Sequence, residues 1–142
     1  MKRHRIFSGA PWEESVGYCR ALRVGDLVFV TGTAPVADGG GVHAAGDAYQ
    51  QARRCFEIIE KAIEQLGATP GDIVRTRMFV TDIRRWQDFA RAHREFVGDN
   101  RPCTTMVEVS ALIDPEMLIE VEADAVISAR PVSALENSFI TR

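Results

Sequence analysis

Apolar and polar residues alternate along this chain with two different periods. From 48 to 66 the apolar residues recur at steps of three and four, which predicts one buried stripe along a helix. Asp47 stands at the expected N-cap of this helix, and Gly67 stands where a glycine stop is expected. A shorter stripe predicts a second helix over 83–97, capped by Asp82. Each stripe needs a packing partner, and the surrounding strands are the large candidates.

Segments with a period of two predict the strands. A strand over 27–31 follows the turn residues Gly25-Asp26, which indicates a hairpin. Residues 73–80 also alternate, and 102–126 predicts two further strands. A short additional strand near 5–8 is compatible with the pattern. The order β-β-α-β-α-β-β predicts an α+β fold, in which two helices cover one face of a mostly antiparallel sheet.

The last predicted strand carries carboxylates on one side. Glu120, Glu122 and Asp124 alternate with apolar residues that we expect under the helices, so the acids face away from the helices. If Thr104, Met106 and Glu108 share that face, a fourth acid joins the group. Such a face commonly meets solvent. Alternatively, a partner subunit covers it, and one glutamate with a raised pKa acts as a base or orients water.

The bulk composition narrows the classes of function. The 142 residues suffice for one domain with a substantial core, which we place at 1–128. Residues 129–142 lack clear periodicity and are expected to form a tail or a subunit-contact arm. The net charge of -3 argues against nucleic-acid binding driven by overall charge. No apolar run approaches the roughly 20 residues that span a bilayer.

The cysteines and the missing motifs narrow these classes further. Three scattered cysteines without a C-x-x-C pair, in a chain without an export signal, predict reduced thiols in a cytoplasmic protein. The chain contains no G-x-S-x-G, H-E-x-x-H, Walker A or G-x-G-x-x-G motif. Its three histidines are far apart, so no metal site is expected. His93 lies on the apolar side of its helix, which fits either a core histidine or one that faces a ligand.

Three stretches of the chain carry a resemblance. They are "GYCRALRVGDLVFVTGTAPV", the segment "LGATPGDIVRTRMFVTDI" after the long helix, and "RPCTTMVEV…LIEVEADAV". In order and spacing they resemble the RidA family, also called YjgF or endoribonuclease L-PSP proteins, up to about Ile127. The resemblance implies a chorismate-mutase-like fold and a homotrimer, with small-molecule sites in clefts between neighbouring subunits. It also implies hydrolysis of reactive enamines and imines, such as 2-aminoacrylate, to a keto acid and ammonia without a metal or organic cofactor.

The resemblance implies a set of site residues. Tyr18 matches the tyrosine that lines the family's cleft, and Thr31 stands where a serine or threonine usually sits. Glu120 matches the glutamate that holds or activates the attacking water. His93 falls where the deaminases commonly have asparagine, so a polar side chain is retained but changed.

The main departure from the family pattern is Thr104. The deaminase motif reads proline, small residue, arginine, and that arginine grips the substrate carboxylate, whereas here the run is Pro102-Cys103-Thr104. A threonine hydroxyl offers one donor and no charge, in place of a planar fork of donors. Arg75, Arg77 and Arg101 are the candidates for a substitute charge.

Two functions compete on this basis. The first is a trimeric enamine or imine deaminase whose substrate is not a simple 2-imino acid, with Glu120 as the catalytic residue and Tyr18, Thr31, His93 and Thr104 as binding residues. The second is a non-catalytic trimer that binds or senses a small molecule. A ribonuclease activity, described for some family members, has weaker support because this acidic chain lacks the basic surface that RNA binding requires.

Overall fold

The computed structural model describes residues 1–128, and the expected tail at 129–142 lies outside the described residues. The main elements, in chain order, are β1 (Arg3–Ile6), β2 (Ala21–Val24), β3 (Leu27–Thr33), α1 (Ala48–Glu64), β4 (Ile73–Val80), α2 (Trp86–Val97), β5 (Cys103–Glu108) and β6 (Ile119–Val126). Short helical turns lie at Glu13–Gly17, Pro70–Asp72, Ile83–Arg85 and Gly98–Asn100. The predicted order of elements is confirmed, and the additional strand begins two residues earlier than expected.

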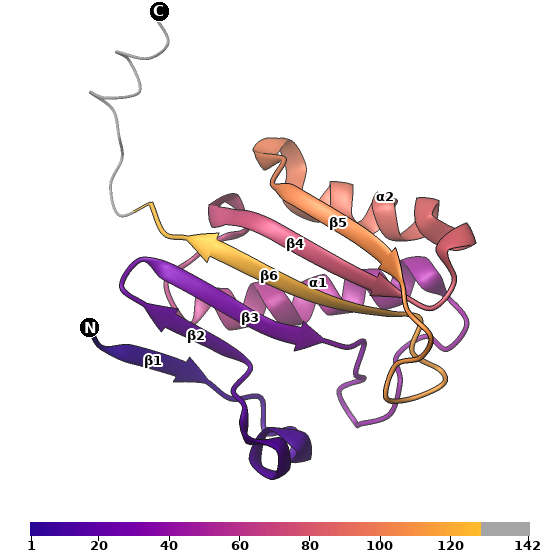
Figure 1. Cartoon of the computed structure of the whole chain (residues 1–142), viewed down its shortest axis with the longest axis horizontal. Coiled ribbons are helices and arrows are strands. Elements are labelled where there is room, and N and C mark those ends of the chain that lie inside the picture. The colour runs from indigo at the N-terminus through magenta and orange to yellow at the C-terminus, as the bar shows by residue number, and fades with distance from the viewer. Residues whose placement is uncertain (129–142) are drawn as a thin grey trace, which may run out of the picture.

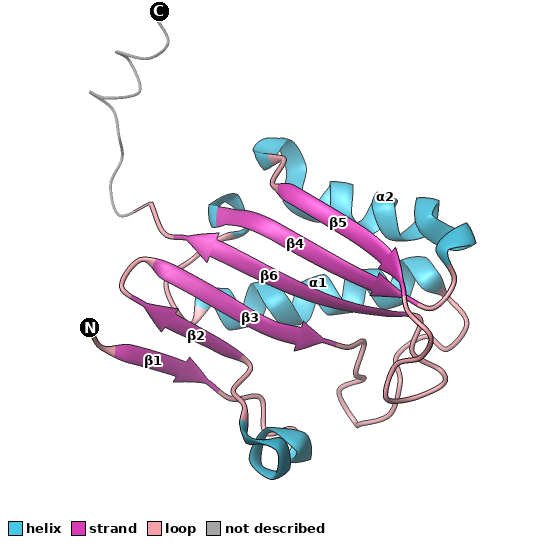
Figure 2. Cartoon of the chain, viewed as in Figure 1, coloured by secondary structure: helices cyan, strands magenta, loops and turns pink. Residues whose placement is uncertain are grey.

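All six of these strands form one sheet, in the order β1-β2-β3-β6-β4-β5. Neighbouring strands are antiparallel except β4 and β5, which are parallel because α2 crosses back between them. Both α-helices lie on one face of the sheet (Figures 1 and 2). The last strand, β6, lies between β3 and β4. The predicted carboxylates therefore lie in the middle of the sheet.

The stripe along α1 forms the centre of the core. Cys55, Ile59 and Ile63 are completely buried between the helix and the sheet. The carboxylate of Asp47 accepts the backbone N–H of Gln50, which caps the helix as predicted. Gly67 adopts a φ of 87°, the left-handed conformation that ends a helix at little cost for glycine.

The second helix packs beside the first. Asp82 accepts the backbone N–H of Arg84 and starts a single turn, after which α2 begins at Trp86. The ring of Phe56 on α1 stacks on Phe96 and meets the ring of His93 edge-on, with 5.7 Å between the latter two centroids. His93 is thus held among apolar side chains, as its place on the apolar stripe predicts.

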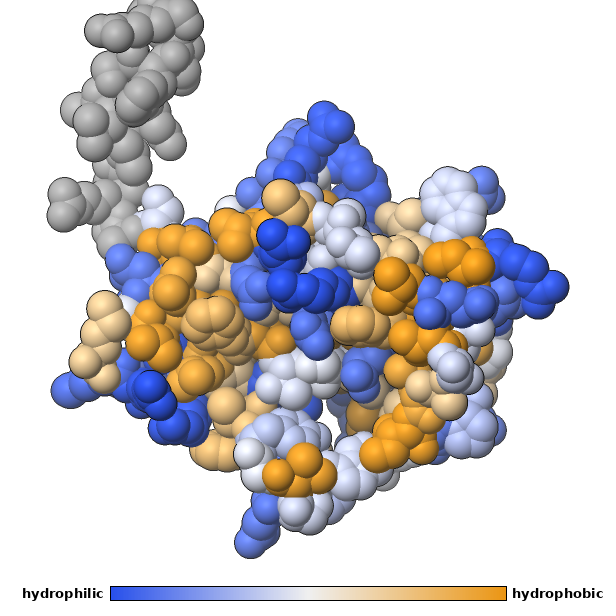
Figure 3. All heavy atoms as spheres, in the orientation of Figure 1, coloured by the Kyte–Doolittle hydropathy of each residue, from blue (hydrophilic) through white to orange (hydrophobic). Residues whose placement is uncertain are grey.

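The alternation along β6 divides the two faces of the sheet as predicted. Ile119, Val121 and Ala123 are buried under the helices, whereas the carboxylate residues are only half-buried on the other face. In Figure 3, which shows that uncovered face, apolar side chains gather in separate areas with charged side chains between them. Exposed apolar residues of its strands include Leu27, Phe29, Val107 and Val126.

The expectation of a fourth acid on the uncovered face is wrong. The parallel register pairs Thr104 with Thr76 and Glu108 with Val80, and both partners are buried on the helix side. Strand residues in register share a face, so Thr104, Met106 and Glu108 lie on the helix side of β5. The carboxylate of Glu108 accepts the backbone N–H of Ile83 there.

Two other predictions concern the cysteines and the possibility of a membrane-spanning helix. The three cysteines form no disulfide within the described residues, and their reduced state stays a prediction. Within residues 1–128 no helix is long and apolar enough to cross a bilayer.

Candidate functional site

Glu120 lies directly against the backbone of β3. The pairing of β3 with β6 shifts its register between Val30 and Thr33, and Gly32 lies in this irregularity. A Cβ atom at residue 32 would lie only 2.7 Å from Oε2 of Glu120. A glycine at this position therefore gives the carboxylate its room.

The surroundings of Glu120 alter its acidity. Burial raises the pKa of this carboxyl above that of an ordinary glutamate. The positive charge of Arg20 opposes the shift, and the negative charge of Glu122 adds to it. A carboxyl with a raised pKa is better matched to proton transfer near neutral pH than an ordinary glutamate.

The other two acids of β6 have a different partner. Nη1 of Arg77 lies 3.6 Å from Oε2 of Glu122 and 3.2 Å from Oδ2 of Asp124. Arg77 therefore pairs with these two acids of β6. Because its guanidinium is already occupied by two carboxylates, Arg77 is a poor candidate for the substitute charge.

Arg20 is a buried cation that the sequence did not reveal. Its Nη1 donates to the backbone oxygen of Gly32 and to Oγ1 of Thr33, both at 2.9 Å. Its Nε lies 3.8 Å from Oε2 of Glu13, another buried carboxylate. Arg20 thus supports the backbone against which Glu120 packs and supplies the positive charge that Glu120 senses.

Tyr18 and Thr31 border a concavity of about 450 Å³. Thr31 donates its hydroxyl proton to the backbone oxygen of Cys19 at 2.7 Å, so its side chain is oriented by the segment that precedes β2. Arg20 lies over the ring of Tyr18, with 5.8 Å from its guanidinium carbon to the ring centroid. Since Gly32 follows Thr31 in the chain, this concavity and Glu120 belong to the same region of the sheet.

His93 and Thr104 belong to a second group, joined by Thr76. Oγ1 of Thr76 lies 2.7 Å from Nε2 of His93 and 2.7 Å from Oγ1 of Thr104. Thr76 is fully buried, whereas Thr104 is exposed on the edge strand β5. Thr76 has a single hydroxyl proton, and when it donates this proton to Thr104, the hydrogen bond with His93 must be donated by Nε2 of the ring. The hydroxyl proton of Thr104 is then free to be donated to a group outside the chain. Burial lowers the pKa of His93, which favours the neutral ring in this chain of hydrogen bonds.

The five predicted site residues therefore form two groups within one chain. Tyr18, Thr31 and Glu120 lie towards β2, β3 and the uncovered face, whereas His93 and Thr104 lie on the helix side at the β5 edge. A single ligand cannot touch both groups of one chain, because the sheet separates them.

Sequence reasoning missed three residues that shape these groups. Thr76 carried a usable signal, since it is the polar member of an otherwise apolar buried face of β4. Gly32 and Arg20 carried none, because an isolated glycine or arginine in a strand region has the same local pattern whether or not it meets a distant side chain.

We expect the substitution Thr76→Val to destabilise the fold. Valine keeps the shape of threonine but leaves Nε2 of His93 without its partner, and an unsatisfied buried polar atom costs about 1–3 kcal/mol. Urea denaturation of the variant should show this loss of unfolding free energy. The matched control is Thr105→Val, at the exposed position that follows Thr104 on β5. Its unfolding free energy should change by no more than about 0.5 kcal/mol. Equal effects of the two substitutions would contradict the assigned hydrogen-bond chain.

Comparison with known proteins decides the family. The model of the family described as "Endoribonuclease L-PSP" matches residues 10–127. The chain belongs to the RidA/YjgF (endoribonuclease L-PSP) family. The crystal structure of Rv2704 from Mycobacterium tuberculosis, a member of the YjgF/YER057c/UK114 family, is 45% identical to this chain with a TM-score of 0.81. That similarity covers 89% of this RidA/YjgF chain and 100% of the other, so the predicted chorismate-mutase-like fold is confirmed.

Two further relatives are proteins whose ligand or reaction is named. The crystal structure of E. coli TdcF with bound serine is similar to this RidA/YjgF chain, with a TM-score of 0.73 and 26% identity. The similarity covers 87% of this chain and 94% of TdcF. The 3-aminoacrylate deaminase RutC of Acinetobacter baylyi is 27% identical over 108 residues, or 76% of this chain and 85% of RutC. Relatives of this chain thus include a protein with a bound amino acid and a deaminase.

Proposed function

We propose that this RidA/YjgF family member hydrolyses a small, reactive enamine or imine, in a cleft between subunits of a homotrimer. The observation that carries the proposal is the setting of Glu120, a half-buried carboxyl with a raised pKa that packs against Gly32. The deaminase RutC among the relatives supports the reaction class. The serine bound to TdcF supports a small, polar ligand.

The reaction needs a positioned water molecule and a proton acceptor. Water adds its oxygen to the carbon of the C=N bond, while the imine nitrogen gains a proton. The resulting carbinolamine then expels ammonia and leaves a carbonyl group. Glu120 is suited to orient the water and to accept its proton, because its raised pKa lies closer to neutrality than that of an exposed glutamate. The hydroxyls of Tyr18 and Thr31 are suited to position the ligand beside it.

The two separate groups of site residues support an intersubunit cleft. Within one chain, Glu120 and Thr104 lie on opposite faces of the sheet, so a site that uses both requires a second copy. The uncovered face exposes Leu27, Val107 and Val126, and apolar patches of this kind mark interaction surfaces. A trimer in which this face is covered would also desolvate Glu120 further and raise its pKa more.

Thr104 limits the substrate in this proposal. The resemblance places an arginine at this position in deaminases that act on simple 2-imino acids. Here the position holds a hydroxyl whose orientation is set through Thr76 by His93. A hydroxyl recognises a neutral oxygen or nitrogen better than it replaces a bidentate ion pair. We therefore propose a substrate other than a simple 2-imino acid.

The test is an imine-hydrolysis assay. Imino acids produced by an amino-acid oxidase, and 2-aminoacrylate produced by a dehydratase, are followed with and without the purified protein. We expect faster hydrolysis of at least one imine and little effect on 2-aminoacrylate. The variant Thr104→Arg should gain activity on 2-aminoacrylate, by about tenfold or more, because it restores a charge-assisted contact.

Two results would count against the proposal. If no imine in the panel is hydrolysed faster by the wild type or by the arginine variant, the hydrolase function is wrong. Binding of the same compounds without turnover would then favour the non-catalytic trimer. That trimer is the second candidate because the chain has no arginine at position 104. A monomer in sedimentation at assay concentration would rule out the intersubunit cleft.

A further inference from the structure

The wall of the concavity beside Tyr18 and Thr31 holds a row of residues that crosses three strands. The register pairs Arg5 of β1 with Leu22 of β2, and Leu22 with Phe29 of β3. Phe29 is paired in turn with Asp124 of β6, which lies on the face that the helices do not cover. Residues in register share a face, and adjacent strands lie about 4.8 Å apart. Arg5, Leu22 and Phe29 therefore form a continuous strip on the uncovered face, and all three line the concavity.

Aromatic residues surround this strip. Phe7 and Tyr18 also line the concavity, and Thr31 lies beside Phe29 along the same side of β3. Phe7 is 62% exposed and Phe29 is 43% exposed, which is costly for two large apolar side chains in one place. A concavity of about 450 Å³ lies within the range that small ligands occupy. Its walls therefore suit an apolar or aromatic group.

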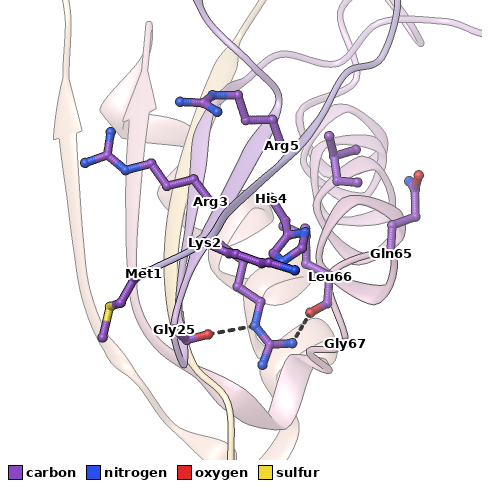
Figure 4. Close-up of a pocket in the computed structure, with 11 residues that line it drawn as sticks. Met1, Lys2, Arg3, His4, Arg5, Gly25, Gln65, Leu66 and Gly67 are labelled. Atoms are coloured by element: carbon purple, nitrogen blue, oxygen red, sulfur yellow. Dashed lines mark hydrogen bonds between the residues drawn. The ribbon is translucent and has the colours of Figure 1, made fainter.

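Arg5 supplies a positive charge at the edge of these apolar walls. In Figure 4, Arg3 and Arg5 extend from one side of β1, whereas the ring of His4 extends from the other side, towards Leu66. A second, open groove lies on that other side, between β1 and the end of α1. Arg5 is exposed, so its guanidinium can reach a ligand without being released from the core.

The other charged groups nearby are already engaged. Arg20 is buried and bonded to Gly32 and Thr33, and Arg77 is paired with acids of β6. Glu13 also lines the concavity, but its carboxylate accepts the backbone N–H and the hydroxyl of Ser8 and the backbone N–H of Gly9. Arg5 is thus the charged wall residue best placed to meet a solvent-borne ion.

From these contacts we infer that the ligand of this concavity combines an apolar or aromatic group with a carboxylate, which Arg5 binds in place of the arginine that the chain lacks at Thr104. The apolar group packs on Phe7, Leu22 and Phe29, and the carboxylate lies towards β1. The inference rests on the proposed function, because it names the substrate class of the same site. Arg5 and Phe7 precede residue 10, where the match to the family model begins.

Binding of three small probes tests the inference without turnover. The probes are 3-phenylpropionate, its neutral amide 3-phenylpropanamide, and propionate, and calorimetric or NMR titration gives their affinities. We expect the phenyl acid to bind about tenfold more tightly than either the amide or propionate, since only it uses both the charge and the apolar walls. The substitution Arg5→Gln should weaken binding of the phenyl acid about tenfold and leave binding of the amide unchanged.

The matched control is Arg3→Gln. Arg3 extends from the same side of the same strand but does not line the concavity, so its loss should change the affinity for the phenyl acid less than twofold. Thermal unfolding monitored by circular dichroism checks that both variants fold. Equal binding of acid and amide, or an unchanged affinity in Arg5→Gln, would overturn the inference. If the phenyl acid binds through Arg5 while no imine is hydrolysed, the ligand class stands and the hydrolase proposal fails.

Discussion

The substitution Glu120→Gln is expected to lower kcat/KM for imine hydrolysis by about 10²- to 10⁴-fold, the range typical for loss of a general base. Glutamine has nearly the same shape as glutamate and still fits beside Gly32, but it cannot accept a proton from water. Binding of the ligand should change little by comparison. Steady-state kinetics on the best imine of the panel measures the loss.

The matched control for this substitution is Glu122→Gln. Glu122 lies two residues further along the same face of β6, but its carboxylate is paired with Arg77. We expect its loss to change kcat/KM by no more than about threefold, as for an exposed ion pair. Comparable losses in the two variants would mean that the charge of the face matters rather than Glu120 itself, and the assigned base would be wrong.

The raised pKa of Glu120 also gives the sign of two pH effects. Activity that needs the carboxylate should fall as pH decreases through this raised pKa, so the acidic limb of kcat/KM should lie above the ordinary glutamate value of about 4.3. For stability, the folded state holds this proton more tightly than the unfolded state. Between the unfolded and folded pKa values, the contribution of Glu120 to stability therefore falls as pH rises. The variant Glu120→Gln lacks this penalty, so it should be at least as stable as the wild type at neutral pH.

The substitution Gly32→Ala is expected to reduce kcat/KM by about 100-fold, although Gly32 itself takes no part in the proposed chemistry. A Cβ at residue 32 would lie 2.7 Å from Oε2 and 3.1 Å from Cδ of Glu120, so the carboxylate must move. A displacement of about 1 Å in a reacting group can cost on the order of 10²-fold in rate. The same assay measures the effect, and the pH profile should shift because the burial of Glu120 changes.

Gly39→Ala is the control for this second substitution. A Cβ at Gly39 would meet no heavy atom within 4 Å, so only the general effect of replacing a glycine applies there. That effect on stability is about 0.4–1 kcal/mol. Unfolding curves show whether Gly32→Ala still folds. A folded Gly32→Ala protein with wild-type kcat/KM would show that the position of Glu120 beside β3 does not matter to the reaction.

The fold could be predicted well from local patterns. The stripe of α1 is evident from the three- and four-residue spacing of its apolar positions. Asp47 and Gly67 each lie within one turn of the helix end that they mark. The alternation in β6 likewise fixed which side chains face the helices. These features depend on residues close in sequence, so local patterns are enough to predict them.

Only part of the candidate site could be predicted from the sequence. Glu120 could be singled out by its place in the motif, and Tyr18, Thr31, His93 and Thr104 could be named by resemblance. Their grouping could not, because the face of β5 depends on the register between β4 and β5. That register placed Thr104 beside Thr76 and removed Glu108 from the carboxylate face.

The sequence by itself therefore determined the elements, their order, the faces of α1 and β6, and the family. Only the tertiary structure decided that Gly32 makes room for Glu120, that Arg20 lies buried beside it, and that Arg5 enters the wall of the concavity. The physical reason is distance along the chain. Gly32 and Glu120 meet through strand pairing, and Arg5 meets Phe29 across an intervening strand. No local pattern records such contacts, because burial, pKa and ligand shape arise from the partners that the fold brings together.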